Sequence, residues 1–228
     1  MTEASGLSAT GYVAVGVDVA EEGKGLDLVA LDQDRQLVVS AGHLTVGDAA
    51  DTILDQVRPA IVCVDSPPGW ARSGKSRDAE RRLARIGIFA FATGADPGEH
   101  RFYRWMRVGF SIYECLAARY PLFRGGDPSG TSAEVFPNAS AILLAGRHRS
   151  ACETKTGFHR QVLRTCNVLE SALPNLDRVD AALGAVTGLL ALEGSYMSLG
   201  EPTEGVILLP VSSLPSTLLR AGAAPVPP

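Results

Sequence analysis

Two segments of the chain are apolar on both faces of a strand, and each ends in an aspartate. Residues 12–18 read YVAVGVD and residues 60–65 read AIVCVD, with no charged side chain before the last position. Such segments are typical of strands at the centre of a sheet that helices cover on both sides. We therefore predict two central strands that end in Asp18 and Asp65.

The residues between these two segments predict how the strands are connected. Turns rich in glycine and acidic residues set off two further apolar segments, at 26–31 and 36–40, which predicts three antiparallel strands. A helix follows from about residue 47, because apolar residues recur there every four positions, and Pro59 stops it. A helical crossover allows the strand at 60–65 to lie beside the first strand and run parallel to it.

The second half of the chain is predominantly helical in its pattern. Residues 133–136 favour one more strand, and residues 206–209 favour an edge strand closed by Pro210. Helices are predicted at 76–85, at 102–120, at 139–145 with Asn138 as the cap, at 156–172 and at 176–193. The predicted fold class is α/β, with a mixed five-stranded sheet in the order 3-2-1-4-5 flanked by helices.

The chain shows no internal repeat and no linker that would divide it. We expect a single domain over residues 11–212, with a basic helical insertion at about 71–125 after the fourth strand. Residues 1–10 are predicted to be a disordered lead, and residues 213–228 a C-terminal tail.

Composition restricts the class of protein. Of the 228 residues, 46% are hydrophobic and 20% are charged, which is ordinary for a globular domain. The apolar runs are too short to cross a membrane, and the N-terminus lacks the basic start and apolar core of a signal peptide. The four cysteines show no metal-binding spacing and are predicted to be reduced. We expect a cytoplasmic protein without a membrane partner.

Positive charge is concentrated in one part of the chain although the net charge is −4. Nine basic residues and four acidic ones lie between Ala71 and Arg107. Such a stretch beside a metal site would suit a polyanionic substrate, and Arg72, Arg77 and Arg81 are candidate substrate contacts. The alternative is a solvated helical face with no ligand.

The two strand-end aspartates carry the candidate chemistry. If their strands are parallel neighbours, Asp18 and Asp65 meet at the same edge of the sheet, with their carboxylates within about 6 Å. Two carboxylates this close repel each other unless a cation neutralises them, and Mg²⁺ or Mn²⁺ prefers such oxygen ligands. Each aspartate taken alone could equally be a turn residue.

Three further acids could join this pair. Glu134 begins the predicted strand at 133–136, and its alternative role is that of an exposed strand-end acid. Asp177 and Asp180 are three residues apart at the start of the last helix, so they share a face, although the helix dipole alone also favours acids there. Small residues such as Ala181 and Gly184 should let this helix approach the sheet.

Six segments of the chain resemble, in order, the motifs of the DUF429 family. They are GVDVA at 16–20, VDSPPGW at 64–70, AERRLARIGI at 79–88, EVFPNASAILLAG at 134–146, DRVDAALGAV at 177–186 and EPTEGVILLP at 201–210. The family is described as predicted nucleases with a ribonuclease H-like (RNase H-like) fold. The resemblance therefore implies a three-layer RNase H-like architecture for nearly the whole chain.

The resemblance also implies site residues. It carries over Asp18, Asp65, Glu134 and Asp180 as catalytic acids, and Asp18, Asp65, Asp177 and Asp180 are our candidate metal ligands. The spacing of Asp177 and Asp180 is similar to that of the helical acid pair in RuvC-type resolvases. Lys155 stands where the family has a lysine and is a further candidate for substrate binding. Glu80 stands where the family more often has Asp, and its longer side chain argues against a role as a direct metal ligand.

Three functions remain open from the sequence. The leading one is a nuclease or phosphodiesterase that depends on a divalent metal and acts on nucleic acid or nucleotides. A second is a binding or scaffold protein that keeps the fold without turnover. The third is an ATP-handling protein of the actin-like and sugar-kinase class, but those proteins usually carry a duplicated domain, which a chain of 228 residues is too short to hold.

Overall fold

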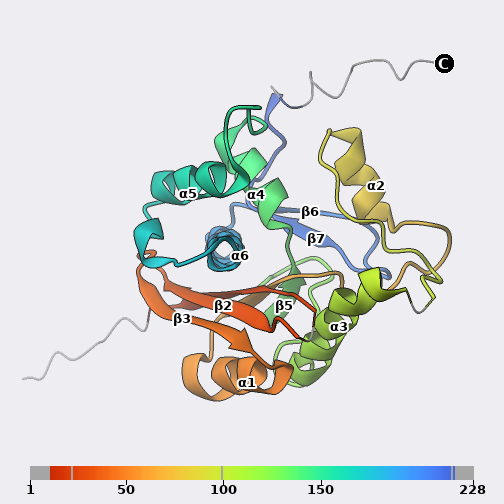
Figure 1. The fold of residues 1–228 in the computed structure, drawn as a ribbon, viewed down its shortest axis with the longest axis horizontal. Coiled ribbons are helices and arrows are strands. Elements are labelled where there is room, and N and C mark those ends of the chain that lie inside the picture. Colours follow the sequence, from red (N-terminus) through yellow and green to blue (C-terminus); the bar gives the residue numbers. More distant parts are fainter. Residues whose placement is uncertain (1–10, 22, 99, 217, 219–228) are drawn as a thin grey trace, which may run out of the picture.

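The computed structural model describes residues 11–21, 23–98, 100–216 and 218. The predicted lead at 1–10 and most of the predicted tail at 213–228 lie outside the described residues. The described part forms a twisted sheet between two layers of helices (Figure 1). Among the described residues, no helix is both long and apolar enough to cross a membrane.

The sheet has seven strands in the order β3-β2-β1-β4-β5-β7-β6. The strands are β1 (Val13–Asp18), β2 (Leu26–Asp32), β3 (Leu37–Leu44), β4 (Ile61–Asp65), β5 (Thr131–Glu134), β6 (Met197–Leu199) and β7 (Ile207–Leu209). The predicted order 3-2-1-4-5, that of an RNase H-like sheet, is confirmed for the first five strands, but the predicted count of five strands was wrong because β7 and β6 extend the sheet. The predicted edge strand at 206–209 corresponds to β7, but β7 lies inside the sheet because the unpredicted β6 pairs with it antiparallel at the edge.

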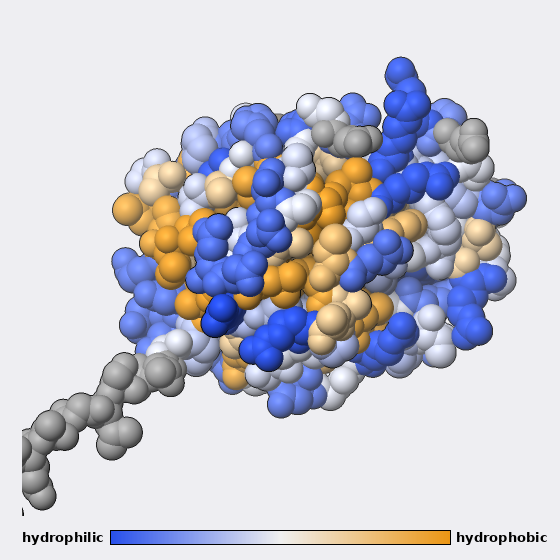
Figure 2. Space-filling model, turned by 90° about the horizontal axis from the view of Figure 1, so that it is seen from below, coloured by the Kyte–Doolittle hydropathy of each residue, from blue (hydrophilic) through white to orange (hydrophobic). Residues whose placement is uncertain are grey.

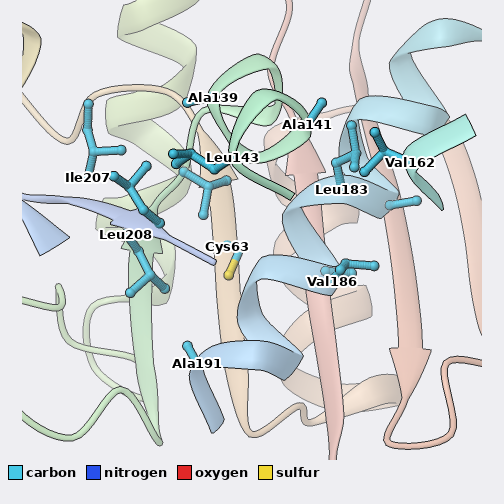
Figure 3. Close-up of a cluster of buried hydrophobic side chains, with 14 of the residues drawn as sticks. Cys63, Ala139, Ala141, Leu143, Val162, Leu183, Val186, Ala191, Ile207 and Leu208 are labelled. Atoms are coloured by element: carbon cyan, nitrogen blue, oxygen red, sulfur yellow. The ribbon is translucent and has the colours of Figure 1, made fainter. Parts of the chain in front are cut away.

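Side chains of the central strands alternate between two hydrophobic cores, as the period of a strand requires. Ala14 and Cys63 belong to the core on one face, and Val15 and Val64 belong to the core on the other. Figure 3 shows Cys63 on the first of these faces, next to the long last helix. Both faces of β1 and β4 are therefore buried, which explains why their sequences are apolar throughout.

The helices divide between the two faces of the sheet. They are α1 (Val46–Asp51), which continues as the π-helix η1 (Thr52–Val57), α2 (Asp78–Arg85), the 3₁₀-helix η2 (Arg101–Tyr103), α3 (Arg104–Leu116), α4 (Pro137–Ala145), α5 (Lys155–Thr165), the 3₁₀-helix η3 (Glu170–Ala172) and α6 (Leu176–Leu192). α4, α5 and α6 cover one face, and α1 and α3 cover the other (Figure 1). Seen from the side of α1 and α3, apolar side chains gather in patches between hydrophilic ones (Figure 2).

α6 lies directly against β1 because small residues face each other there. A Cβ atom at Gly16 would lie 1.8 Å from the carbonyl oxygen of Ala181 and 2.6 Å from the amide nitrogen of Ala185. A Cβ atom at Gly184 would in turn lie 3.4 Å from the Cα atom of Gly16. The predicted close approach of this helix is confirmed, and it brings the start of α6 to the carboxyl ends of β1 and β4.

Several predicted boundaries were wrong for local reasons. Asn138 does not cap α4, because the helix already begins at Pro137, a residue that suits the first turn. The helix predicted at 102–120 starts as a 3₁₀ turn and ends at Leu116. The helix predicted at 156–172 is α5 followed by the separate turn η3, with Thr154 as the cap of α5.

Candidate active site

Asp18 and Asp65 lie side by side at the carboxyl edge of the sheet. β1 and β4 are parallel, and the two aspartates are register partners as the last residues of their strands. Both side chains are half-buried, and neither forms an ion pair within the described part of the chain. By strand alternation they project to the same face as Ala14 and Cys63, which is the face that α6 covers.

The two carboxyl groups hold protons far more tightly than ordinary aspartates. Burial, followed by repulsion from Asp65, raises the pKa of Asp18 from 3.8 to about 9. Burial and the charge of Asp180 raise the pKa of Asp65 from 3.8 to about 8. Within the described residues no ion pair neutralises either carboxyl group, and a bound cation would displace their protons and relieve the repulsion between the two carboxylates.

α6 presents its first two acids to this pair. Asp180 is buried, and its charge raises the pKa of both Asp18 and Asp65, whereas Asp177 acts on the pKa of Asp18. Asp177 also forms an ion pair with Lys24 at 2.8 Å, and its side chain is 25% exposed. Asp180 therefore lies deeper in the cluster, and Asp177 lies at its rim.

Asp180 is held by two basic side chains from α5. The Nζ atom of Lys155 donates to one carboxylate oxygen at 2.8 Å, and the Nδ1 atom of His159 lies 2.6 Å from the other. His159 is fully buried, and its Nε2 atom lies 3.4 Å from the side-chain oxygen of Asn138. Sequence analysis missed His159. Its position four residues after Lys155 on one helix face was the available signal.

Asp27, opposite Asp18 on the neighbouring strand, is another acid that sequence analysis missed. It is buried, and it accepts a hydrogen bond from Arg178 of α6, which also bonds the hydroxyl of Ser40. Because Arg178 neutralises it, Asp27 is a structural ion pair that anchors α6 to the sheet.

Glu134 is near enough to Asp65 for its charge to raise the pKa of that residue, but Arg77 holds its carboxylate, which corrects the expectation of a further carboxylate on the same side as the Asp18–Asp65 pair. It is register partner to Val64, and the two carboxylate oxygens accept hydrogen bonds at 2.7 and 2.6 Å from the guanidinium of Arg77. Burial raises the pKa of Glu134, and the charge of Arg77 opposes that rise. Its neighbour Ala133 faces the α6 side, so Glu134 projects to the opposite face.

Arg77 is correspondingly not placed to bind substrate. Its side chain is 1% exposed, and its Nε atom donates to Glu80 at 2.9 Å while its other nitrogens serve Glu134. Glu80 is buried in the same network and also accepts from the amide of Thr93, which agrees with the expectation that it is no metal ligand. The predicted substrate role of Arg77 is therefore corrected to a structural one.

The other predicted basic contacts divide into two groups. Arg72 and Arg81 are on or before α2, where Arg81 faces Asp78 at 3.5 Å and the amide of Arg72 donates to Glu204. Lys155 is the one of these residues that reaches the acidic cluster, and its side chain remains 47% exposed. Arg101, Arg104 and Arg107, near the start of α3, are exposed.

A hollow of about 260 Å³ opens beside Asp65. Its polar lining includes Ser66 and Lys155, and its apolar lining includes Phe91, Trp105 and Phe136. The hollow is smaller than typical drug-sized sites, which begin at about 300 Å³. It therefore suits a small group next to the acidic pair.

The donor chemistry of the cluster fits a hard divalent cation, but the ligand set is incomplete as the side chains stand. Within the described residues, no group of three or more His, Cys, Asp or Glu side chains is placed to hold a metal ion. Asp18 and Asp65 supply two carboxylates, whereas both oxygens of Asp180 are engaged by Lys155 and His159. Asp180 can serve as a third ligand only if Lys155 withdraws.

Comparisons with known proteins bear on the family and on the fold. Residues 16–205 match the model of a family described as "Protein of unknown function (DUF429)". Two solved structures are similar, "Thermus thermophilus RuvC structure" and "T. thermophilus RuvC in complex with Holliday junction substrate". Each is 17% identical with a TM-score of 0.41, over 80% of this chain and 95% or 94% of theirs. No curated protein matches the chain.

Proposed function

The chain belongs to the DUF429 family, and from that premise and the geometry of its acidic cluster we propose that it is a divalent-metal-dependent nuclease or phosphodiesterase acting on nucleic acid or nucleotides. The observation that carries the proposal is the register pair of Asp18 and Asp65, two adjacent carboxylates with no cation from the described chain. Structural acids elsewhere in the molecule, such as Asp27 and Glu134, are each neutralised by an arginine.

Asp18 and Asp65 would hold Mg²⁺ or Mn²⁺, with Asp180 as the third ligand. The cation, when bound, would supply Lewis-acid stabilisation of the phosphoryl group and a water of lowered pKa. His159 fixes one oxygen of Asp180 from inside the protein, so the carboxylate keeps its direction toward the pair. Lys155 is half exposed at the rim of the cluster. Its ammonium group could therefore leave Asp180 and form an ion pair with a substrate phosphate instead.

The test compares the wild type with Asp18→Asn on a panel of DNA and RNA substrates in Mg²⁺, in Mn²⁺ and in EDTA. We expect cleavage by the wild type with metal only, and none by the variant. Asp55→Asn, which removes an exposed carboxylate from η1, is the matched control and should cleave as the wild type does.

Melting temperatures measured with added metal distinguish the proposed nuclease from a non-catalytic scaffold protein. Binding of millimolar Mg²⁺ or Mn²⁺ should raise the melting temperature of the wild type and of Asp55→Asn, but not of Asp18→Asn. If the wild type neither gains stability from the metal nor cleaves any substrate, the nuclease proposal fails and the scaffold function remains.

A further inference from the structure

Three neighbouring hollows, which share lining residues, follow one another from the acidic pair along the start of α3. The hollow beside Asp65 shares Val19 and Trp105 with a second one of about 620 Å³. The second shares Glu21 and Arg104 with a third one of about 1050 Å³, which extends to the edge of β2 and β3. We call these three adjoining hollows together the α3 groove.

Arginines line the outer part of the α3 groove. Arg101, Arg104 and Arg107 are spaced three residues apart and are exposed, and none of them forms an ion pair within the described residues. Glu21 is the one acid among the described lining residues of the second and third hollows. The guanidinium of Arg107 is positioned by the carbonyl of Gly98 at 2.7 Å. The outer groove therefore presents a row of positive charge.

Aromatic rings are interleaved with these arginines. Phe91 is 63% exposed and Phe102 is 39% exposed, although both are large apolar side chains. The ring centroid of Phe91 lies 5.1 Å from that of Phe102 and 6.2 Å from that of Trp105, and both contacts are edge-on. Edge-on packing leaves ring faces available, and the three rings line the inner and middle parts of the groove.

We propose that the α3 groove binds single-stranded nucleic acid and leads its backbone to the acidic pair. Exposed ring faces stack on bases that are not already stacked in a duplex, and a row of unpaired arginines follows phosphates along a strand. A protein partner with an apolar surface would leave Arg101 and Arg104 facing it without counter-charges. The inference deepens the proposed function, because it names the substrate class of the same site.

The test measures binding in EDTA, where no cleavage occurs. Fluorescently labelled dT and rU strands of about 20 nucleotides, together with a duplex of equal length, are titrated with wild-type protein. We expect tighter binding of at least one of the single strands than of the duplex, with quenching of tryptophan fluorescence as bases stack near Trp105. The DNA and RNA arms identify which strand the groove prefers.

Variants locate the binding surface. The double variant Phe91→Ala/Phe102→Ala should bind the single strand about 5- to 100-fold more weakly, the range that loss of one or two stacking contacts produces. Arg104→Ala should reduce the slope of log affinity against log salt by about 1. The controls are Phe89→Ala, an exposed phenylalanine that does not line the groove, and Arg164→Ala, an exposed arginine on α5; both should bind as the wild type does.

The binding proposal and the nuclease proposal are contradicted by different outcomes. Asp18→Asn should lose cleavage and keep single-strand binding, so an inert but binding wild type would remove the nuclease proposal and leave the groove intact. Duplex bound as tightly as the single strands, or full affinity in Phe91→Ala/Phe102→Ala with an unchanged melting temperature, would overturn the groove proposal.

Discussion

Asp65 and Glu134 end neighbouring parallel strands, one residue out of register, and yet they have opposite roles. Asp65 faces α6 together with Asp18, has no ion pair in the described chain, and has a pKa raised to about 8. Glu134 faces the other side of the sheet, where Arg77 holds both of its oxygens. The fold thus decides whether an acid at a strand end is neutralised, by placing an arginine against it or leaving it without one.

The comparison also shows how the fold keeps the two clusters distinct. The Arg77–Glu134–Glu80 network is closed, because each carboxylate accepts from Arg77 and Glu80 also accepts from the amide of Thr93. The Asp18–Asp65 pair is open, because neither carboxyl group forms an ion pair in the described chain and the half-exposed Lys155 beside it bonds Asp180 instead. The first cluster stabilises the fold. In the second, the carboxylates of Asp18 and Asp65 repel each other once they lose their protons, and a bound cation can relieve that repulsion.

The largest expected effect comes from breaking the closed cluster. Arg77→Met leaves Glu134 and Glu80 buried without a cation, and it should lower the free energy of unfolding by about 3–5 kcal/mol. Urea denaturation measures this loss. Arg81→Met, which removes an exposed arginine from the same helix, should stay within about 0.5 kcal/mol of the wild type. Equal stability of the two variants would show that the closed cluster is not structural.

The open cluster should respond to pH in the opposite sense from a stabilising ion pair. Its folded pKa values of about 9 and about 8 lie above the ordinary 3.8, so the folded state holds protons that the unfolded chain releases. The stability from these protons is complete below about pH 4 and is lost as the pH rises toward 9.

Asp18→Asn removes one of the two groups that cause this loss of stability at high pH. Without metal, its melting temperature at pH 9 should therefore exceed that of the wild type by about 2–8 °C. At pH 5 the two proteins should melt at similar temperatures. A scanning-calorimetry series across this range measures the difference. A gap that stays constant with pH would mean that neither burial nor the charge of Asp65 raises the pKa of Asp18 in the folded protein.

A smaller effect is expected from the cation that borders the open cluster. Lys155 lowers the pKa of both Asp18 and Asp65 through its charge, so Lys155→Met should make the site more negative and raise its affinity for Mn²⁺ by about 10-fold. Calorimetric titration at constant pH gives the affinity. Lys75→Met removes an exposed lysine that forms no contact with the cluster and should leave the affinity unchanged. Weaker binding by Lys155→Met would mean that the lysine supports the metal site.

The smallest effect should come from the rim of the open cluster. Asp177 is already paired with Lys24, and its charge contributes less to the raised pKa of Asp18 than those of Asp65 and Asp180. Asp177→Asn should therefore change the affinity for Mn²⁺ by less than about 3-fold. Asp180→Asn serves as the comparison and should weaken it by at least about 10-fold. Similar losses in both variants would make Asp177 a metal ligand, as its spacing predicts.

Local patterns predicted most of the architecture. The apolar segments at 12–18 and 60–65, each ending in Asp, were sufficient to predict the two central parallel strands and the pairing of their last residues. β6 has three residues, too few for a period to identify it, and because β6 was not predicted, β7 was placed at the edge of the sheet.

The sequence by itself determined where carboxylates would meet, because strand parity and a helical crossover follow from residues near one another in the chain. Only the tertiary structure decided which acids would keep their negative charge unbalanced. Arg77 reaches Glu134 across 57 residues, Lys155 and His159 reach Asp180 across 25 and 21, and Arg178 reaches Asp27 across 151. Such partners have no signature in local spacing. They arise from packing of the helices on the sheet, and they separate the site from the scaffold that holds it.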